Sequence, residues 1–185
     1  MSRATLSLVA LAGLTIGCGS GIKDIVVQPA PSTLQAVADS TTTLVASAAT
    51  QTDAAMAKVR VATISRDLED ARTLVLTARD AAATANTQVD AAIRQGEWLR
   101  TVLVQDSLAA GRVDYERYWR LGRQKLTAAR QLSSRAVAVA DSALSCTEQT
   151  CAASRARQMA SQIEAAAGVT REAESVVRVA MVHVH

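Results

Sequence analysis

The stretch YERYWRLGRQKLTAARQLSSRAVAVADSA, residues 115–143, decides the fold of this chain. Its small and apolar side chains recur at alternating intervals of three and four residues, which is the spacing of a helix with one buried face. This stripe consists of Tyr115, Trp119, Gly122, Leu126, Ala129, Ser133, Ala136, Ala140 and Ala143. The pattern predicts a long helix that packs against other helices along its whole length.

Two further stripes with the same spacing lie on either side of this stretch in the sequence. The earlier stripe consists of Val61, Ile64, Leu68, Ala71, Val75, Ala78, Ala82, Ala85, Val89 and Ala92. The later stripe consists of Ala156, Met159, Ile163, Ala166, Thr170, Ala173, Val177 and Ala180. Three such stripes predict three helices that bury these faces against one another.

The fold class predicted from these stripes is all-α, an elongated antiparallel three-helix bundle or coiled coil. The expected helices are residues 53–94, 98–145 and 152–182. We expect a break at Arg94–Gly96 and a turn at Cys146–Cys151. A four-helix bundle stays open as an alternative, because residues 33–50 can fold back as a further helix.

The three-helix arrangement also predicts which segments face each other. Antiparallel pairing of the first two helices places Trp119 opposite the region of Thr73. It brings the Cys146–Cys151 turn close to the beginning of the domain and leaves a hairpin tip at Trp98 pointing away from it.

Composition supports a single helical domain. The chain has 185 residues, of which 49% are hydrophobic, and it contains no phenylalanine. Both prolines, Pro29 and Pro31, precede the predicted helices, and proline is the residue that a helix interior tolerates least. Alanine, valine and leucine must therefore supply most of the buried surface.

The N-terminus has the features of a targeting segment. Arg3 precedes an apolar stretch over residues 4–16, which is shorter than the roughly 20 residues that a membrane-spanning helix needs. The stretch ends in Leu14-Thr15-Ile16-Gly17-Cys18, which resembles the lipobox of bacterial lipoproteins. We therefore expect a signal peptide over residues 1–17, a lipidated N-terminus and tether over residues 18–31, and the bundle domain over residues 32–185.

The resemblance implies that Cys18 carries diacylglycerol and holds the chain at a membrane. Several acyl chains, each contributing about 0.8 kcal/mol per buried methylene, would make this anchor permanent. Gly19 follows the cysteine where inner-membrane lipoproteins have aspartate, so the resemblance implies an outer-membrane location facing the periplasm in a host with two membranes. An ordinary cleaved secretion signal is the alternative.

The two remaining cysteines, Cys146 and Cys151, form an even pair between two predicted helices. In an exported protein such a pair predicts a disulfide across the turn. A pair of free thiols in a cytosolic protein is the alternative.

The residues that catalysis or cofactor binding would require are scarce. The only histidines are His183 and His185, and the chain has no haem-attachment motif, no Glu-x-x-His pair and no glycine-rich phosphate loop. We therefore predict a protein that is not an enzyme, with no catalytic residues and no cofactor. A metal or haem held by His183 and His185, with a methionine such as Met56 or Met181, is the alternative to a solvated C-terminus.

Aromatic and basic residues concentrate in the middle of the chain. All four aromatic side chains fall within residues 98–119, and residues 112–135 carry seven basic side chains against two acidic ones. We identify Trp98, Arg117, Tyr118 and Arg120 as a candidate docking surface for an anionic partner: lipid headgroups, envelope polysaccharide or an acidic protein, but not nucleic acid. The alternative is an ordinary core with a solvated face.

Taken together, these features predict a membrane-anchored exported lipoprotein with a noncatalytic domain. It would act as a scaffold, spacer or accessory subunit that binds an envelope protein through its helix faces. Homo-oligomers through alanine-rich faces remain open. The alternative function is a periplasmic bundle that binds a small molecule, a metal or haem.

Overall fold

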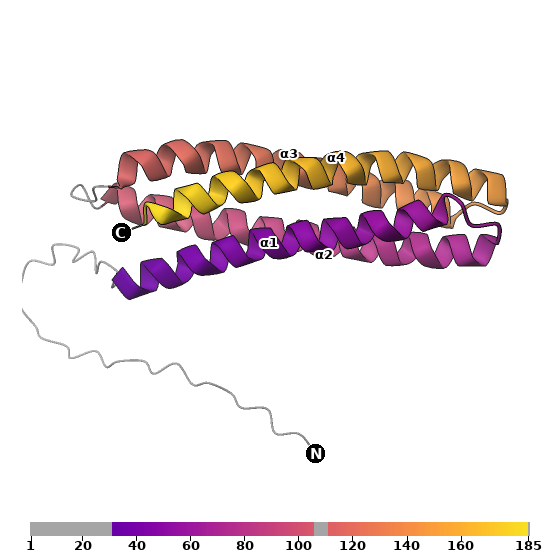
Figure 1. The fold of residues 1–185 in the computed structure, drawn as a ribbon, viewed down its shortest axis with the longest axis horizontal. Coiled ribbons are helices and arrows are strands. Elements are labelled where there is room, and N and C mark those ends of the chain that lie inside the picture. Colours follow the sequence, from indigo (N-terminus) through magenta and orange to yellow (C-terminus); the bar gives the residue numbers. More distant parts are fainter. Residues whose placement is uncertain (1–30, 106–110, 185) are drawn as a thin grey trace, which may run out of the picture.

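The computed structural model describes residues 31–105 and 111–184, which form four long antiparallel helices (Figure 1). Their bounds are α1 Pro31–Ala62, α2 Leu68–Gln105, α3 Arg112–Leu144 and α4 Gln149–Val182. The prediction of an elongated, all-α antiparallel bundle is confirmed, in the four-helix form. Cys18, the predicted signal peptide and His185 lie outside the described residues.

The helices form a closed ring in cross-section. α1 packs on α2 and α3 packs on α4 most extensively, while contacts of α1 with α4 and of α2 with α3 complete the ring. The 38 residues of α2 make a rod about 57 Å long at 1.5 Å per residue. No helix among the described residues combines the length and the hydropathy that crossing a bilayer requires.

The two ends of the rod differ in what they carry (Figure 1). Residues 31 and 184 lie at one end, together with the segments where α2 ends and α3 begins. We call this the Pro31 end. The opposite end carries the α1–α2 turn over residues 63–67 and the α3–α4 turn over residues 145–148, and we call it the Cys146 end.

The predicted stripes of the last two helices are confirmed in full. Every residue of the stripe from Tyr115 to Ala143 is buried in α3, and every residue of the stripe from Ala156 to Ala180 is buried in α4. The earlier stripe is buried in α2 from Ala71 onward. Small side chains at these positions let the helix backbones approach closely.

The beginning of the earlier stripe was predicted wrongly. α1 ends at Ala62, and Val61 and Ile64 are 51% and 78% exposed instead of buried. The carboxylate of Asp67 accepts a hydrogen bond of 2.8 Å from the amide of Asp70, which caps the start of α2. The regular spacing therefore continues across a turn by coincidence.

The predicted break at Gly96 was also wrong, because α2 continues through it to Gln105. The glycine makes room for a neighbour: a Cβ atom at Gly96 would lie 2.1 Å from Cη2 of Trp119. Trp119 therefore faces Gly96 and not Thr73, and the register between α2 and α3 differs from the predicted one.

These shifts reverse the predicted orientation of the rod. The prediction placed the Cys146–Cys151 turn near the beginning of the domain, but that turn lies at the opposite end from residue 31 (Figure 1). The physical reason is α1, which adds one more pass along the rod before the first predicted hairpin begins.

The core changes character along the rod. At the Pro31 end it contains bulky side chains, including Leu99, Tyr115, Trp119 and Leu126. At the Cys146 end it consists mostly of alanines with Met56, Met159 and Ile163.

Candidate functional site

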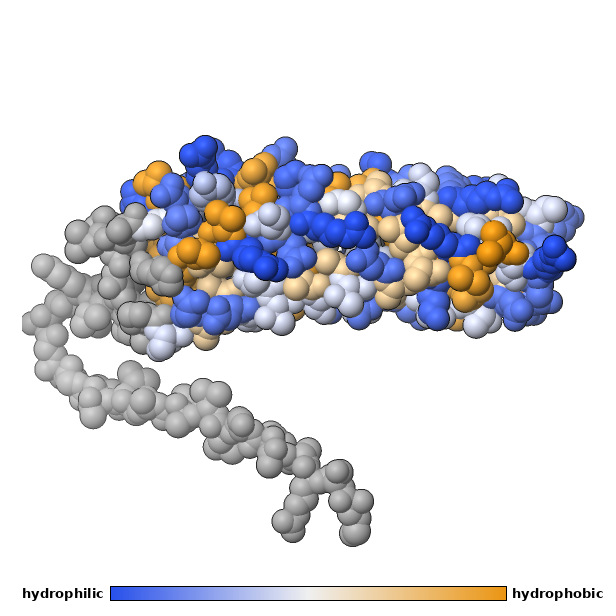
Figure 2. Space-filling view, in the orientation of Figure 1, coloured by the Kyte–Doolittle hydropathy of each residue, from blue (hydrophilic) through white to orange (hydrophobic). Residues whose placement is uncertain are grey.

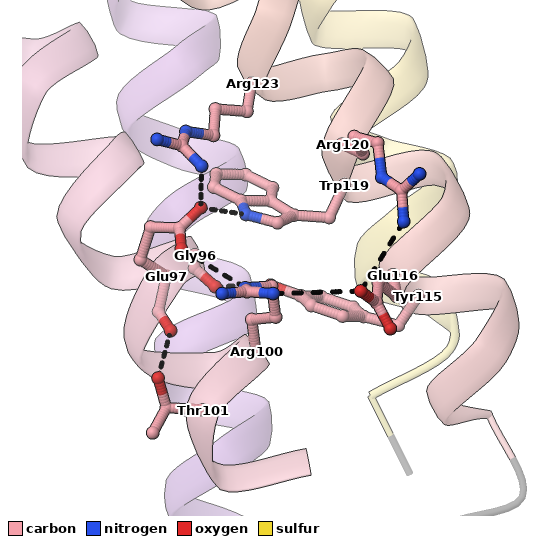
Figure 3. A network of polar contacts seen from close by, with 9 residues as sticks. All are labelled: Gly96, Glu97, Arg100, Thr101, Tyr115, Glu116, Trp119, Arg120 and Arg123. Carbon is pink, nitrogen blue, oxygen red and sulfur yellow. Dashed lines mark hydrogen bonds and ion pairs between the residues drawn. The ribbon is translucent and has the colours of Figure 1, made fainter. Parts of the chain in front are cut away.

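Two aromatic residues of α3, Tyr115 and Trp119, lie at the interface with α2 (Figure 3). Tyr115 and Trp119 are buried, with ring centroids 6.3 Å apart, and the Tyr115 hydroxyl donates a 2.8 Å hydrogen bond to the Gly96 carbonyl. Burial raises the pKa of the Tyr115 phenol well above its ordinary value, and the charge of Glu97 raises it further. These two rings are therefore part of the core.

Glu97 of α2 is the centre of a polar network around the Trp119 indole (Figure 3). Its Oε1 accepts a hydrogen bond of 2.9 Å from Trp119 Nε1 and lies 3.2 Å from an Arg123 guanidinium nitrogen. Its Oε2 accepts a bond of 3.2 Å from Arg100 Nε. One carboxylate thus pairs with two arginines and satisfies the indole N–H.

Glu116 of α3 makes the looser part of the same network. Its Oε1 lies 3.7 Å from Arg100 and 3.6 Å from Arg120, which are distances for ion pairs and not for good hydrogen bonds. The six charged and aromatic side chains of the network line a surface hollow of about 150 Å³. With three arginines and two glutamates, this hollow has a small positive excess and its charges are largely paired within the protein.

Sequence reasoning did not identify Glu97 as a functional residue. The spacing of Glu97 and Arg100, three residues apart on a helix, is the one signal that could have pointed to it. Its contacts with Trp119 and Arg123 depend on the register between α2 and α3, which the sequence pattern predicted incorrectly.

The four residues of the predicted docking surface do not form one surface. Trp98 is 40% exposed and follows Gln95 by three residues, so it lies on the side of α2 that faces α1, because Gln95 Nε2 donates to Ser40 of α1. Arg117 and Arg120 are exposed on α3. The structure therefore separates Trp98 from the arginines.

Tyr118 and His183 meet between α3 and α4. Their rings stack with centroids 5.8 Å apart, and the Arg117 guanidinium lies 5.7 Å from the Tyr118 centroid. Within residues 31–105 and 111–184, no three side chains of His, Cys, Asp or Glu are grouped as a metal site would require.

The outer surface of α3 has an unusual charge distribution. Residues 117–140 contain no acidic side chain. They contain the basic residues Arg117, Arg120, Arg123, Lys125, Arg130 and Arg135. Lys125 reaches Glu172 of α4 at 2.5 Å, and Arg130 reaches Asp90 of α2 at 3.1 Å, so acidic partners come from the neighbouring helices.

At the Cys146 end, the sulfur atoms of Cys146 and Cys151 lie 2.10 Å apart, at the distance of a disulfide. Two contacts hold this turn to the rest of the bundle. A guanidinium nitrogen of Arg72 donates to the Cys146 carbonyl, and Gln149 Nε2 donates to the Ser65 carbonyl. The two turns at this end are therefore linked to each other.

Comparison of the chain with models of protein families, with curated proteins and with solved structures gives no match.

Proposed function

We propose that this chain is an exported lipoprotein, anchored at Cys18, whose bundle serves as a noncatalytic spacer or scaffold. The observation that carries this proposal is the interior of the bundle, where each buried hydroxyl of the described residues has a partner inside the protein. Together with the lipobox-like sequence at Cys18, this leaves the surface of the rod as the part that interacts with other molecules.

The buried polar groups support a structural role for the interior. In the described part of the chain the buried polar residues are Thr41, Thr52, Ser133 and Thr170. The three threonines donate to carbonyls one turn earlier in their own helices, and Ser133 donates to the Ala82 carbonyl of α2 at 3.1 Å. No hydroxyl among these is left to bind a ligand.

Ion pairs between helices support a rod with a fixed register. Arg79 of α2 reaches Asp141 of α3 at 2.6 Å, and Arg171 of α4 reaches Asp53 of α1 at 2.5 Å. Exposed pairs like these contribute only about 0–1 kcal/mol each, so their effect is on alignment more than on stability. A rigid rod of this kind suits a spacer that presents its faces to an envelope protein.

Intact-mass analysis of the membrane fraction tests the anchor. In a bacterial host with lipoprotein processing, the wild-type chain should begin at Cys18 and carry the mass of diacylglycerol and an acyl chain. The Cys18→Ser variant should lose that mass, whereas the Cys146→Ser/Cys151→Ser variant should retain it. A chain cleaved elsewhere without lipid, or a chain with an intact N-terminus, would refute the proposal.

A further inference from the structure

Exposed apolar side chains gather on α3 and α4 at the Pro31 end. Val113, Leu121, Val179 and Val182 are 71%, 44%, 41% and 61% exposed, which is unusual for such large apolar groups in one region. Figure 2 shows apolar surface interspersed with basic and other polar surface over this end of the two helices. We call these four residues the end patch.

Contacts between α3 and α4 define how the patch is arranged. Tyr118 stacks on His183, and Lys125 pairs with Glu172, so the start of α3 runs beside the end of α4. In this antiparallel register Leu121 lies beside Val179, while Val113 and Val182 belong to the last turns of the rod.

Three arginines flank the end patch, and Asp114, Glu116 and Glu174 lie close to them in the sequence. Arg117 and Arg120 lie on α3 between Val113 and Leu121, and Arg178 precedes Val179 on α4. Arg120 lies 3.6 Å from Glu116, and Arg178 lies 2.8 Å from Glu174, each within its own helix. Among the described residues, Arg117 has no salt-bridge partner. Apolar side chains flanked by arginines fit the boundary between anionic headgroups and acyl chains, where the guanidinium binds phosphate and the apolar group enters the bilayer.

The position of the patch relative to Cys18 favours a lipid surface over other occupants. Twelve residues lie between Cys18 and Pro31, so a fully extended chain places the Pro31 end at most about 45 Å from an anchor at Cys18. The Cys146 end lies a full rod length farther away. The end patch thus lies toward the end of the bundle that an anchor holds closer to the membrane, as do the exposed Trp98 and Val104 of α2.

We propose that the end patch docks the Pro31 end of the bundle on the anionic phospholipid surface of the membrane that holds the lipid anchor. This inference depends on the proposed function, because it takes the anchor at Cys18 as given. Basic residues near an anionic surface add electrostatic attraction to the insertion of the valines. The anchor and the patch then fix the rod at two points.

Spin labels on the lipidated protein in vesicles test this docking. A nitroxide is attached to Val113→Cys or, separately, to Val182→Cys, and the protein is reconstituted in vesicles of phosphatidylcholine with phosphatidylglycerol. We expect collisions of either label with a water-soluble nickel relaxant to be several-fold fewer, and collisions with oxygen more frequent, than for a label at the Cys146 end in the same vesicles.

Ile64→Cys provides the matched control, because Ile64 is also apolar and exposed but lies at the Cys146 end. Its label should stay fully accessible to nickel. The Arg117→Glu/Arg120→Glu double substitution should restore nickel access at position 113, although the protein still floats with the vesicles.

The outcomes separate this inference from the anchor itself. Floating, lipidated protein whose label at position 113 is as accessible as that at position 64 would overturn the docking and leave the anchor intact. Dipolar broadening between labels at position 113 would assign the patch to a second copy of the chain and would also overturn it. Protein without lipid that does not float would refute the proposed function.

Discussion

Gly96 and Trp119 pack tightly against each other at the α2–α3 interface. A methyl group at Gly96 would overlap the indole, since its carbon would lie 2.1 Å from Cη2 of Trp119. Forcing extra volume into a packed core costs about 1–3 kcal/mol. We therefore expect Gly96→Ala to lower the free energy of unfolding by about 1–3 kcal/mol, measured by urea denaturation.

Gly168→Ala is the matched control for this substitution. Gly168 also lies inside a helix, but a Cβ atom there would have no neighbour within 4 Å. Alanine should raise the free energy of unfolding by about 0.5–1 kcal/mol, because it favours the helix more than glycine does. Equal effects at the two glycines would contradict the packing of Trp119 on Gly96.

Tyr115 should make the stability of the bundle depend on alkaline pH. Burial raises the pKa of its phenol above the ordinary value of 10.0, so above that pH only the unfolded chain releases the proton. The contribution of Tyr115 to stability is therefore intact below about pH 10 and falls by about 1.4 kcal/mol per pH unit above it. The difference in unfolding free energy between wild type and Tyr115→Phe, measured at pH 8 and 11, should decrease accordingly.

Tyr118→Phe distinguishes this effect from a general alkaline loss of stability. The substitution leaves the hydrogen bond from Tyr115 to the Gly96 carbonyl in place. This variant should therefore lose stability above pH 10 as the wild type does. A Tyr115→Phe variant with the same alkaline loss as the wild type would argue against the buried phenol.

The connection between α3 and α4 carries the cysteine pair, Cys146 and Cys151, whose sulfur atoms lie at the distance of a disulfide. A disulfide that closes so small a ring lowers the conformational entropy of the unfolded chain. In the chain-entropy estimate this raises the free energy of unfolding by about 2 kcal/mol. We expect a reducing agent to lower the unfolding free energy of the wild type by about 2 kcal/mol. The measurement is urea denaturation with and without the reductant.

The Cys146→Ser/Cys151→Ser variant is the control for the reductant. Its stability should match that of the reduced wild type and should not change when the reductant is added. A wild type that does not respond would mean that the two thiols are free.

α1 shows why part of the fold escaped the sequence pattern. Its buried residues also alternate at intervals of three and four, but two of them are threonines, Thr41 and Thr52, which interrupt an apolar stripe. The stripe is Ala38, Thr41, Val45, Ala48, Thr52, Ala55, Val59 and Ala62, and Ala49 and Met56 are buried beside it. Each threonine hydroxyl donates to a carbonyl one turn earlier, so burial leaves no donor without a partner. Admitting both threonines to the stripe, as Thr170 is admitted in α4, extends the pattern over residues 38–62 of α1.

α3 and α4 were predictable because small or apolar residues fill their stripes, with Ser133 and Thr170 as the polar exceptions. The candidate site was less predictable, because it depends on which residues of different helices meet. The burial of Tyr115 and Trp119 followed from their places in the stripe. The pairing of Glu97 with Arg123 did not, since the continuation of α2 through Gly96 to Gln105 shifts every contact between α2 and α3.

In the whole molecule, the number of helices determines which residues lie at each end of the rod. Four passes return the chain to its starting end, so the bulky core and the end patch lie beside residue 31. The Cys146–Cys151 pair and the exposed Ile64 lie at the other end. A three-helix rod would have exchanged these neighbours, and the same surface residues would have supported a different orientation toward a membrane.

The placement of residues 31 and 184 at one end also determines how the rod bears mechanical load (Figure 1). A pull between these residues would peel α1 and α4 away from that end, breaking the contacts turn by turn at low force. Compression along the rod, in contrast, is shared by four helices that lie side by side. The bundle should therefore resist compression better than a pull between residues 31 and 184.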